Sequence, residues 1–181
     1  MKVSENFLVS SFQSHVVEAG LVDTKRCHFG PDTAICADLE LALVDGVWPE
    51  NAGTFLLLEA KSHHSLDSPN TINKIFGQLL KETGKPKTSP ARCGQHSFGV
   101  LIPADTCEWR ANGQLHTRGS GDEYYRRGFR RIDRNVYIEF GTLVDAKFVL
   151  SFSVSKNALS LYSWQGFYDG HPPTFVENKN V

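Results

Sequence analysis

Apolar positions recur with helical spacing in two segments of the first half of the chain. In residues 4–19 they lie three or four positions apart, at Leu8, Phe12, Val16 and Ala19. In residues 71–84 the same spacing places apolar side chains at Ile72, Ile75, Phe76, Leu79 and Leu80. Each pattern gives a helix one apolar face, and Gly20 and Gly84 stand where such a helix would end. We therefore predict two amphipathic helices.

Three other segments carry strand patterns. Residues 33–44 alternate apolar and polar side chains, whereas residues 54–61 and 96–104 are almost continuously apolar, which is typical of strands buried on both faces. Together with the helices they give the order helix, strand, strand, helix, strand. This order predicts a mixed α/β (α+β) fold in which helices flank a central mixed β-sheet.

The first two strands are expected to pair as an antiparallel hairpin. Asp45-Gly46 and the loop-like residues 49–53 separate them. A turn near residues 48 and 49 places Asp38 approximately across from Glu59. The hairpin would therefore bring two carboxylates to the same end of the sheet.

The second half of the chain shows less regular patterns. Residues 105–121 are rich in Gly, Asn and Thr and are predicted to form a loop. Residues 122–134 are predicted to form one basic helix, because arginines recur there at helical spacing: Arg126, Arg127, Arg130, Arg131 and Arg134. Two strands over residues 136–144 and 146–155 are expected to follow, and residues 170–181 are predicted to be a polar tail.

Length and charge narrow the possibilities further. With 181 residues, we expect a single domain over residues 1–181, with its core in residues 4–104 and a C-terminal basic helix and strands over residues 122–160. The formal net charge is -1, which gives no overall attraction to nucleic acid. Binding to nucleic acid would therefore need a local basic patch, such as the arginine cluster.

No apolar run approaches the roughly 20 residues that a membrane helix needs. The N-terminal residues also lack the basic start and long apolar stretch of a signal peptide. We therefore expect a cytoplasmic protein with no membrane partner.

Glu59 and Lys61 stand at the end of the apolar strand predicted for residues 54–61. Because side chains alternate along a strand, both point to the same side. Burying an ionised group costs several kcal/mol unless a partner charge or a metal ion compensates. The pattern therefore predicts that something on that side binds both charges.

Asp38, then a hairpin, then Glu59-x-Lys61 on an apolar strand, then a helix that carries Gln78 form an arrangement that resembles the PD-(D/E)XK nuclease superfamily. That superfamily includes restriction endonucleases, exonucleases and repair or resolving nucleases. The resemblance covers about residues 24–103 together with the helix that precedes them. It implies a restriction-endonuclease-like core and Mg²⁺-dependent hydrolysis of nucleic-acid phosphodiester bonds, with DNA as the expected substrate.

The resemblance also assigns a role to each residue. Asp38, Glu59 and the backbone carbonyl of Ala60 would supply the hard oxygen ligands that Mg²⁺ prefers, with Mn²⁺ as a substitute. Lys61 would activate the attacking water and stabilise the transition state, and Gln78 would position the lysine or the water. The five arginines would hold the nucleic-acid backbone. A homodimer or a partner protein would allow such a nuclease to cut both strands.

Two assignments leave alternatives near the motif. The dipeptide Pro31-Asp32 matches the superfamily's name literally, but Asp32 lies six residues farther from the hairpin turn than Asp38, so Asp38 is the preferred ligand. Glu40 points to the same side as Asp38. It is either an additional ligand or, as we prefer, a solvated strand residue.

Three further polar residues lie close to these elements. His63 and His64 follow the motif directly, and we predict that they belong to an exposed loop rather than contact a phosphate. Glu5 falls near the apolar face of the first helix, where we interpret it as a partly buried side chain with one hydrogen-bond partner.

Other functional classes remain open on the sequence alone. Asp38, Glu59 and Lys61 would also be compatible with a salt-bridge cluster at a sheet edge. The chain would then be a non-catalytic nucleic-acid-binding protein or complex subunit that keeps the fold. An interaction module unrelated to nucleic acid is a third possibility.

Overall fold

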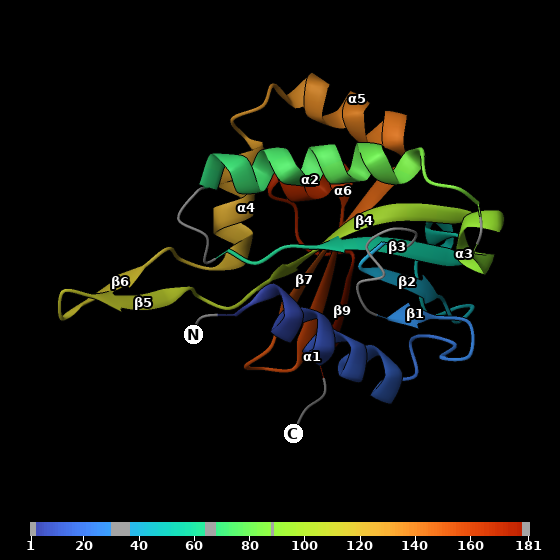
Figure 1. Cartoon of the computed structure of the whole chain (residues 1–181), viewed down its shortest axis with the longest axis horizontal. Helices are drawn as coiled ribbons and strands as arrows, with labels where there is room; N and C mark the ends of the chain where they lie inside the picture. The colour runs from blue at the N-terminus through green and yellow to red at the C-terminus, as the bar shows by residue number, and fades with distance from the viewer. Residues whose placement is uncertain (1–2, 30–36, 64–67, 88, 179–181) are drawn as a thin grey trace.

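A computed structural model describes residues 3–29, 37–63, 68–87 and 89–178. It contains a mixed sheet of seven strands in the order β1-β2-β3-β4-β7-β8-β9 (Figure 1). The pairs β3-β4 and β4-β7 are parallel, and the other neighbours in this sheet are antiparallel. The predicted mixed α/β architecture with a central mixed sheet is therefore confirmed.

Helices and strands are interspersed along the chain, and η1 is a short 3-10 helix. In chain order they are α1 (Glu5–Glu18), β1 (His28–Phe29), β2 (Leu39–Ala42), η1 (Glu50–Ala52), β3 (Phe55–Ala60), α2 (Ser68–Thr83), α3 (Pro90–Cys93), β4 (His96–Pro103), β5 (Glu108–Ala111), β6 (Gln114–Thr117), α4 (Gly121–Phe129), α5 (Arg134–Val144), β7 (Ala146–Ser153), β8 (Ala158–Ser163), α6 (Trp164–Asp169) and β9 (Phe175–Asn178).

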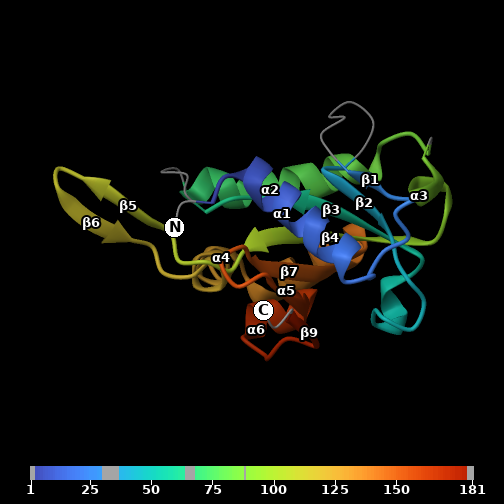
Figure 2. The same cartoon turned by 90° about the horizontal axis from the view of Figure 1, so that it is seen from below.

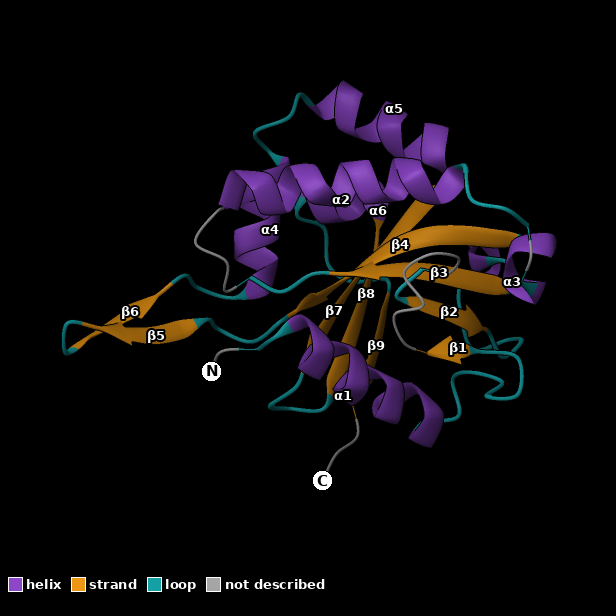
Figure 3. Cartoon of the chain, in the orientation of Figure 1, coloured by secondary structure: helices purple, strands orange, loops and turns teal. Residues whose placement is uncertain are grey.

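Helices cover both faces of the sheet (Figure 3). Helix α1 packs on one face, and α2, α4, α5 and α6 pack on the other. A hydrophobic core lies on each face of the sheet, and strand β3 contributes side chains to both. Leu57 packs on the α2 side, whereas Leu56 and Leu58 pack on the α1 side. By the same alternation, Glu59 lies on the α2 side of the sheet.

The predicted hairpin of β2 and β3 is confirmed, with its register. Leu39 pairs with Leu58, and Leu41 pairs with Leu56. Extending this antiparallel register by one residue places Asp38 across from Glu59. The predicted helices at α1 and α2 and the predicted strands at β3, β4 and β7 are confirmed as well.

The loop predicted for residues 105–121 is wrong, because β5 and β6 form a two-stranded hairpin there. Its turn is made by Asn112 and Gly113, both with positive φ, 50° and 76°. This two-residue turn suits the twist of a hairpin. The hairpin extends away from the main sheet in both views (Figures 1 and 2), and we call it the β-arm.

The single basic helix predicted for residues 122–134 is also wrong, and so is the strand predicted for residues 136–144. Helix α4 ends at Phe129, and α5 begins at Arg134. Asp133 separates them because its side chain caps α5, accepting from the backbone N–H of Asn135 at 2.9 Å. Helix α5 then buries Tyr137, Gly141 and Val144, which fall on one helical face.

The chain also contains elements that the sequence analysis did not predict. Among these are β8, α6 and β9, and β9 lies within the segment expected as a polar tail. None of the helices in the described part of the chain has the length and apolar character needed to cross a membrane.

Candidate functional site

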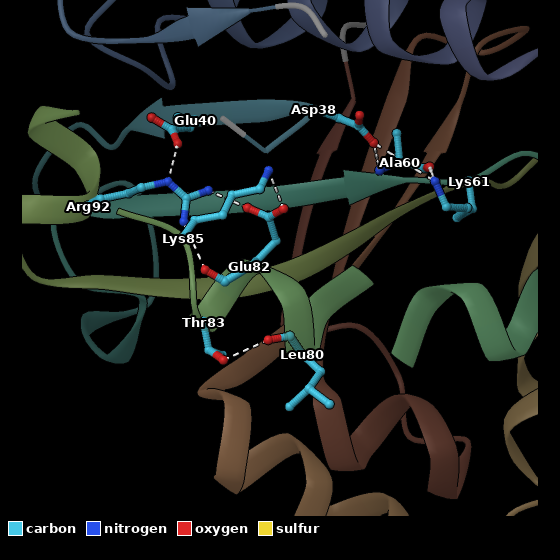
Figure 4. Close-up of polar contacts among 9 residues, drawn as sticks. All are labelled: Asp38, Glu40, Ala60, Lys61, Leu80, Glu82, Thr83, Lys85 and Arg92. Carbon is cyan, nitrogen blue, oxygen red and sulfur yellow. Dashed lines mark hydrogen bonds and ion pairs between the residues drawn. The ribbon is translucent and has the colours of Figure 1, made fainter. Parts of the chain in front are cut away.

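Asp38 is fixed against the end of β3 by a hydrogen bond. Its Oδ2 accepts from the backbone N–H of Ala60 at 2.8 Å. The contact follows from the register of the hairpin, which sets Asp38 beside the last residues of β3. One of the two predicted carboxylates therefore has a defined position at the strand end (Figure 4).

The Lys61 ammonium group lies within this same group of oxygens. Its Nζ donates to the backbone carbonyl of Ala60 at 2.5 Å and to Glu5 Oε2 at 3.4 Å, and it lies 4.0 Å from Asp38 Oδ2. The lysine is only 7% exposed. The structure thus brings Asp38, Ala60 and Lys61 together as the sequence predicted, and adds Glu5 from the first turn of α1.

The Glu59 carboxyl is buried beside the same strand end, and its residue is 4% exposed. Burial raises the pKa of this carboxyl to about 8, with the negative charge of Asp38 as a second cause, while the Lys61 ammonium acts in the opposite direction. Burial disfavours the charged form, and a neighbouring carboxylate disfavours it further. Asp38 and Glu59 are therefore close enough for their charges to repel.

Two carboxylates that repel each other beside a backbone carbonyl suit a hard divalent cation. Asp38, Glu59 and the Ala60 carbonyl provide such an oxygen set. In the described part of the chain, no three His, Cys, Asp or Glu side chains gather closely enough to bind a metal by themselves. A metal ion at this position would therefore rely on the backbone carbonyl and on water as well as on the two side chains.

Lys61 lines a pocket of about 500 Å³, whereas Asp38, Glu59 and Ala60 are not among its lining residues. Gln78 from α2 shares its wall with Lys61, and Glu5, Ser62, Thr71 and Lys74 complete the wall. The Gln78 Oε1 atom is buried and has no hydrogen-bond partner among the described residues. Gln78 is thus near the lysine, as predicted, with an amide oxygen that can still accept a hydrogen bond.

A second charged cluster lies farther along β3, to the left of the first in Figure 4. Arg92 bonds to Glu40 at 3.0 Å and to Glu82, and Glu82 also pairs with Lys85 at 2.5 Å. Glu40 and Arg92 are 1% and 3% exposed. Glu40 is therefore neither solvated nor placed as an extra ligand, and the solvated position predicted for it is wrong, because Arg92 neutralises it inside the protein.

Glu82 and Lys85 connect this second cluster to the first. Glu82 raises the pKa of the Glu59 carboxyl and Lys85 lowers it, as smaller contributions than those of burial, Asp38 and Lys61. The buried cluster therefore influences the charge of the candidate site without contributing a residue to its pocket.

Hydrogen bonds from other elements fix the segment that follows Lys61. His63 has no exposed surface, so the prediction of an exposed loop at this residue is wrong. Its carbonyl accepts from Arg118 Nη1 at 3.2 Å, and the carbonyl of Ser62 accepts from the Tyr125 hydroxyl at 2.7 Å. Asp32 and His64 lie outside the described residues.

The five arginines predicted to bind nucleic acid divide into two groups with different surroundings. Arg126 and Arg130 donate through Nε to the carbonyls of Phe167 at 2.9 Å and Tyr168 at 2.8 Å. Arg134 makes two hydrogen bonds to Asp169, at 2.8 and 2.7 Å. These three guanidinium groups hold the C-terminal end of α6, where the helix leaves carbonyls without helical partners and where positive charge is favourable.

Arg127 and Arg131 make no such contacts. Both are exposed, and within the described residues no hydrogen bond or ion pair engages either guanidinium group. Of the five arginines predicted to bind nucleic acid, these two have their charged groups available.

Several residues of the site were missed in the sequence because their role depends on long-range packing. Glu82 and Arg92 could be recognised only by their burial, which no local pattern indicates. Lys74 lies on the polar face of α2, where the sequence does not distinguish it from other exposed residues, and only the position of the pocket relates it to Lys61. Glu5 was not missed: it was predicted to be a partly buried side chain with one hydrogen-bond partner, and the structure confirms this with Lys61 as the partner.

The chain was compared with protein-family models, curated proteins and solved structures, and no match was found in any of the three.

Proposed function

We propose that this chain is a divalent-metal-dependent nuclease that hydrolyses phosphodiester bonds in DNA, built on the restriction-endonuclease-like core of the PD-(D/E)XK superfamily. The observation that carries the proposal is the convergence of Asp38, Glu59 and Lys61 at the ends of two paired strands. A helix that carries Gln78 beside the same pocket supports it.

In this proposal, Mg²⁺ or Mn²⁺ would be held by Asp38, Glu59 and the Ala60 carbonyl. When bound, such an ion neutralises charge on the scissile phosphate and makes a bound water more acidic. Ionisation of Glu59 would be required, and a nearby cation favours it by opposing the effects of burial and of Asp38. Asp38 is already held in place by the N–H of Ala60.

Lys61 would act on the water and on the phosphate. Its ammonium group lies at the mouth of the pocket, where it can bind the attacking water and stabilise the negative charge that develops in the transition state. The buried Gln78 Oε1 has a free acceptor position, which can orient the same water or the lysine. The Glu5 carboxylate accepts from Nζ at 3.4 Å and would help to hold the ammonium group in position.

A non-catalytic nucleic-acid-binding subunit is a second candidate function. One observation favours it: Lys61 Nζ lies 2.5 Å from the Ala60 carbonyl oxygen, so the ammonium group already binds the carbonyl that a metal ion would use. In that case Lys61 would close the site permanently, and neither metal binding nor cleavage would occur.

Cleavage assays separate the two candidates. Purified protein is incubated with linear DNA, closed circular DNA and RNA, each with Mg²⁺, Mn²⁺ or EDTA. The nuclease proposal expects cleavage of DNA with either metal ion and none with EDTA. Binding of nucleic acid without cleavage under all these conditions would favour the second candidate.

A further inference from the structure

The strongest unassigned feature outside the candidate active site is a pocket of about 270 Å³ beside α4. Three arginines from different parts of the chain line it. Arg118 follows the β-arm, Arg127 belongs to α4 and Arg131 lies in the turn after α4. Tyr124 and Gly128 complete the lining, so no carboxylate is among its lining residues.

Arg127 and Arg131 give this pocket positive charge that none of its lining residues neutralises. Within the described part of the chain, Arg127 and Arg131 have no hydrogen bond or ion pair. Their neighbours Arg126, Arg130 and Arg134 are all bound to α6. Guanidinium groups gathered around one pocket repel one another. A bound anion would offset this repulsion, and the net charge of the chain, -1, does not supply such a local negative charge.

Tyr124 gives a second, independent indication of a ligand. This residue is 5% exposed, it lines the pocket, and its hydroxyl is buried without a hydrogen-bond partner among the described residues. A buried hydroxyl that lacks a partner costs free energy. A phosphate oxygen is a suitable acceptor for such a hydroxyl and for guanidinium groups, which bind phosphate through two parallel hydrogen bonds.

The pocket is connected directly to the segment that follows Lys61. Arg118 Nη1 donates to the His63 carbonyl at 3.2 Å, and the His63 ring packs against Tyr124 with a centroid distance of 6.0 Å. His63 follows Lys61 by two positions in the chain, so their Cα atoms lie at most about 7 Å apart. Phosphates follow one another along a DNA strand at about 3.4 Å of helix axis. A strand with one phosphate at Lys61 can therefore place another, a few nucleotides away, in this pocket.

Arg118 also connects the pocket to the β-arm. The Arg118 guanidinium lies 5.2 Å from the ring centroid of Trp109 and 5.7 Å from that of Tyr124. Trp109 in turn stacks on His116 across the β-arm, with a centroid distance of 5.4 Å. Arg118 is thus held in place by two aromatic rings, which reduces the entropy that it loses when it binds a ligand.

We propose that Arg118, Arg127 and Arg131, with the Tyr124 hydroxyl, bind a phosphate group of the nucleic-acid strand, a few nucleotides away from the phosphate of the same strand that lies at Lys61. This inference rests on the proposed function for its substrate, and it assigns to that substrate a second contact outside the reacting centre. The phosphate is either a strand-terminal 5′-phosphate or an internal phosphodiester, since both present anionic non-bridging oxygens that accept hydrogen bonds.

The test measures binding in EDTA, where cleavage does not occur. The double variant Arg127→Gln/Arg131→Gln removes two exposed charges that have no hydrogen bond or ion pair within the described residues. Its matched control, Lys25→Gln/Lys81→Gln, removes two exposed charges elsewhere on the surface. Fluorescence anisotropy follows a short duplex with a 3′ label and either a 5′-phosphate or a 5′-hydroxyl, with closed circular DNA as competitor, at several salt concentrations.

We expect the double arginine variant to bind about tenfold or more weakly than the control, with a salt slope flatter by about one unit for each phosphate that is no longer bound. A terminal site predicts that the wild type prefers the 5′-phosphate duplex and that the variant loses the preference. An internal site predicts equal weakening for both duplexes and for circular DNA.

Equal affinity and salt slope in the two double variants would overturn the inference, as would a wild type that binds neither of the two duplexes nor circular DNA. The outcome is distinct from that of the cleavage assay. A protein that cleaves DNA but binds it equally well in both variants keeps the proposed function and loses this pocket. A protein that binds through the pocket but never cleaves keeps the pocket and loses the nuclease proposal.

Discussion

Asp38 accepts a hydrogen bond from the backbone N–H of Ala60 at 2.8 Å, across the ends of β2 and β3. This contact fixes a carboxylate beside the carbonyl of the same residue, Ala60, to which the Lys61 ammonium is bound at 2.5 Å. A carboxylate, a carbonyl and an ammonium group are therefore held in a single constellation by two neighbouring strands. Substitutions in this constellation and in the charged clusters around it should have distinct and measurable effects.

Replacing Lys61 separates chemistry from binding. Lys61→Met removes the ammonium group and keeps an unbranched apolar stem of similar length. The cleavage rate with Mg²⁺ should fall by about 10²-fold or more, because a positioned acid, base or electrostatic group is removed. The affinity for DNA measured in EDTA should change little. A variant that cleaves at the wild-type rate would exclude Lys61 from the chemistry.

Three of the arginines predicted to hold nucleic acid should instead affect stability. Arg126→Ala and Arg130→Ala each remove a hydrogen bond to the end of α6, so each should lower the free energy of unfolding by about 0.5–1.5 kcal/mol, measured by urea denaturation. Arg127→Ala is the matched control, because this neighbouring side chain makes no hydrogen bond or ion pair within the described residues. If Arg127→Ala destabilised the protein as much as Arg126→Ala, the division of the arginines into two groups would be wrong.

Arg92 is predicted to be essential for stability. It is 3% exposed and neutralises the buried Glu40 and Glu82, so Arg92→Met leaves Glu40 without its partner and Glu82 with Lys85 alone. The cost should be about 3–5 kcal/mol in the free energy of unfolding. Adding Glu40→Gln to this variant removes the unpaired charge and should recover much of the stability in the same urea titration. No recovery would indicate that packing rather than charge decides the effect.

Glu59 should make stability depend on pH in an unusual direction for a carboxyl group. Its pKa in the folded protein, about 8, lies above the ordinary value of 4.5, so the folded state binds the proton more tightly than the unfolded state. The stabilisation from protonation is therefore complete below pH 4.5 and is lost as the pH rises through 8. Glu59→Gln keeps a neutral side chain at every pH.

The free energy of unfolding of Glu59→Gln should therefore exceed that of the wild type by little at about pH 5 and by more at about pH 9. The difference should grow by up to about 1.4 kcal/mol for each pH unit between the pKa values of the unfolded and folded states. Urea titrations at the two pH values in EDTA measure it. Glu50→Gln, at an exposed position, serves as the control and should show no such difference. A pH-independent effect of Glu59→Gln would mean that the Glu59 carboxyl is not perturbed by burial and by Asp38.

The sequence predicted the part of the fold whose patterns are local. The apolar run of β3 and the spacing of Ile72, Ile75 and Leu79 in α2 are strong signals, because burial on two faces or on one helical face leaves a regular period. The position of Asp38 across from Glu59 followed from counting residues on either side of the turn. That count succeeded because an antiparallel register depends only on where the hairpin turns.

The errors arose where two patterns compete or where tertiary packing decides. Residues 136–144 alternate enough to suggest a strand, but Asp133 is a helix cap, and the buried positions Tyr137, Gly141 and Val144 follow a helical spacing. The pair Asn112-Gly113 is a strong hairpin signal that the loop prediction for residues 105–121 overlooked.

The partners of the buried charges could not be predicted at all. Arg92 lies in a helix of four residues, and nothing in its neighbourhood along the chain indicates that it binds Glu40 or Glu82. The distinction between Arg126, which binds the end of α6, and Arg127, which does not, depends on α6, an element without a clear sequence pattern. Long-range contacts of this kind leave no period in the sequence.

The most direct test of the central claim is the rate of DNA hydrolysis by Asp38→Asn with Mg²⁺, compared with the wild type and with Asp32→Asn. Asn keeps the size of the side chain and its ability to accept from the Ala60 N–H, but it removes the charge that the metal site needs. We expect metal-dependent hydrolysis by the wild type and a rate lower by about 10²-fold or more in Asp38→Asn. Asp32→Asn should retain most of the wild-type activity. A wild type that hydrolyses no faster with Mg²⁺ than with EDTA, or an Asp38→Asn variant as active as the wild type, would contradict it.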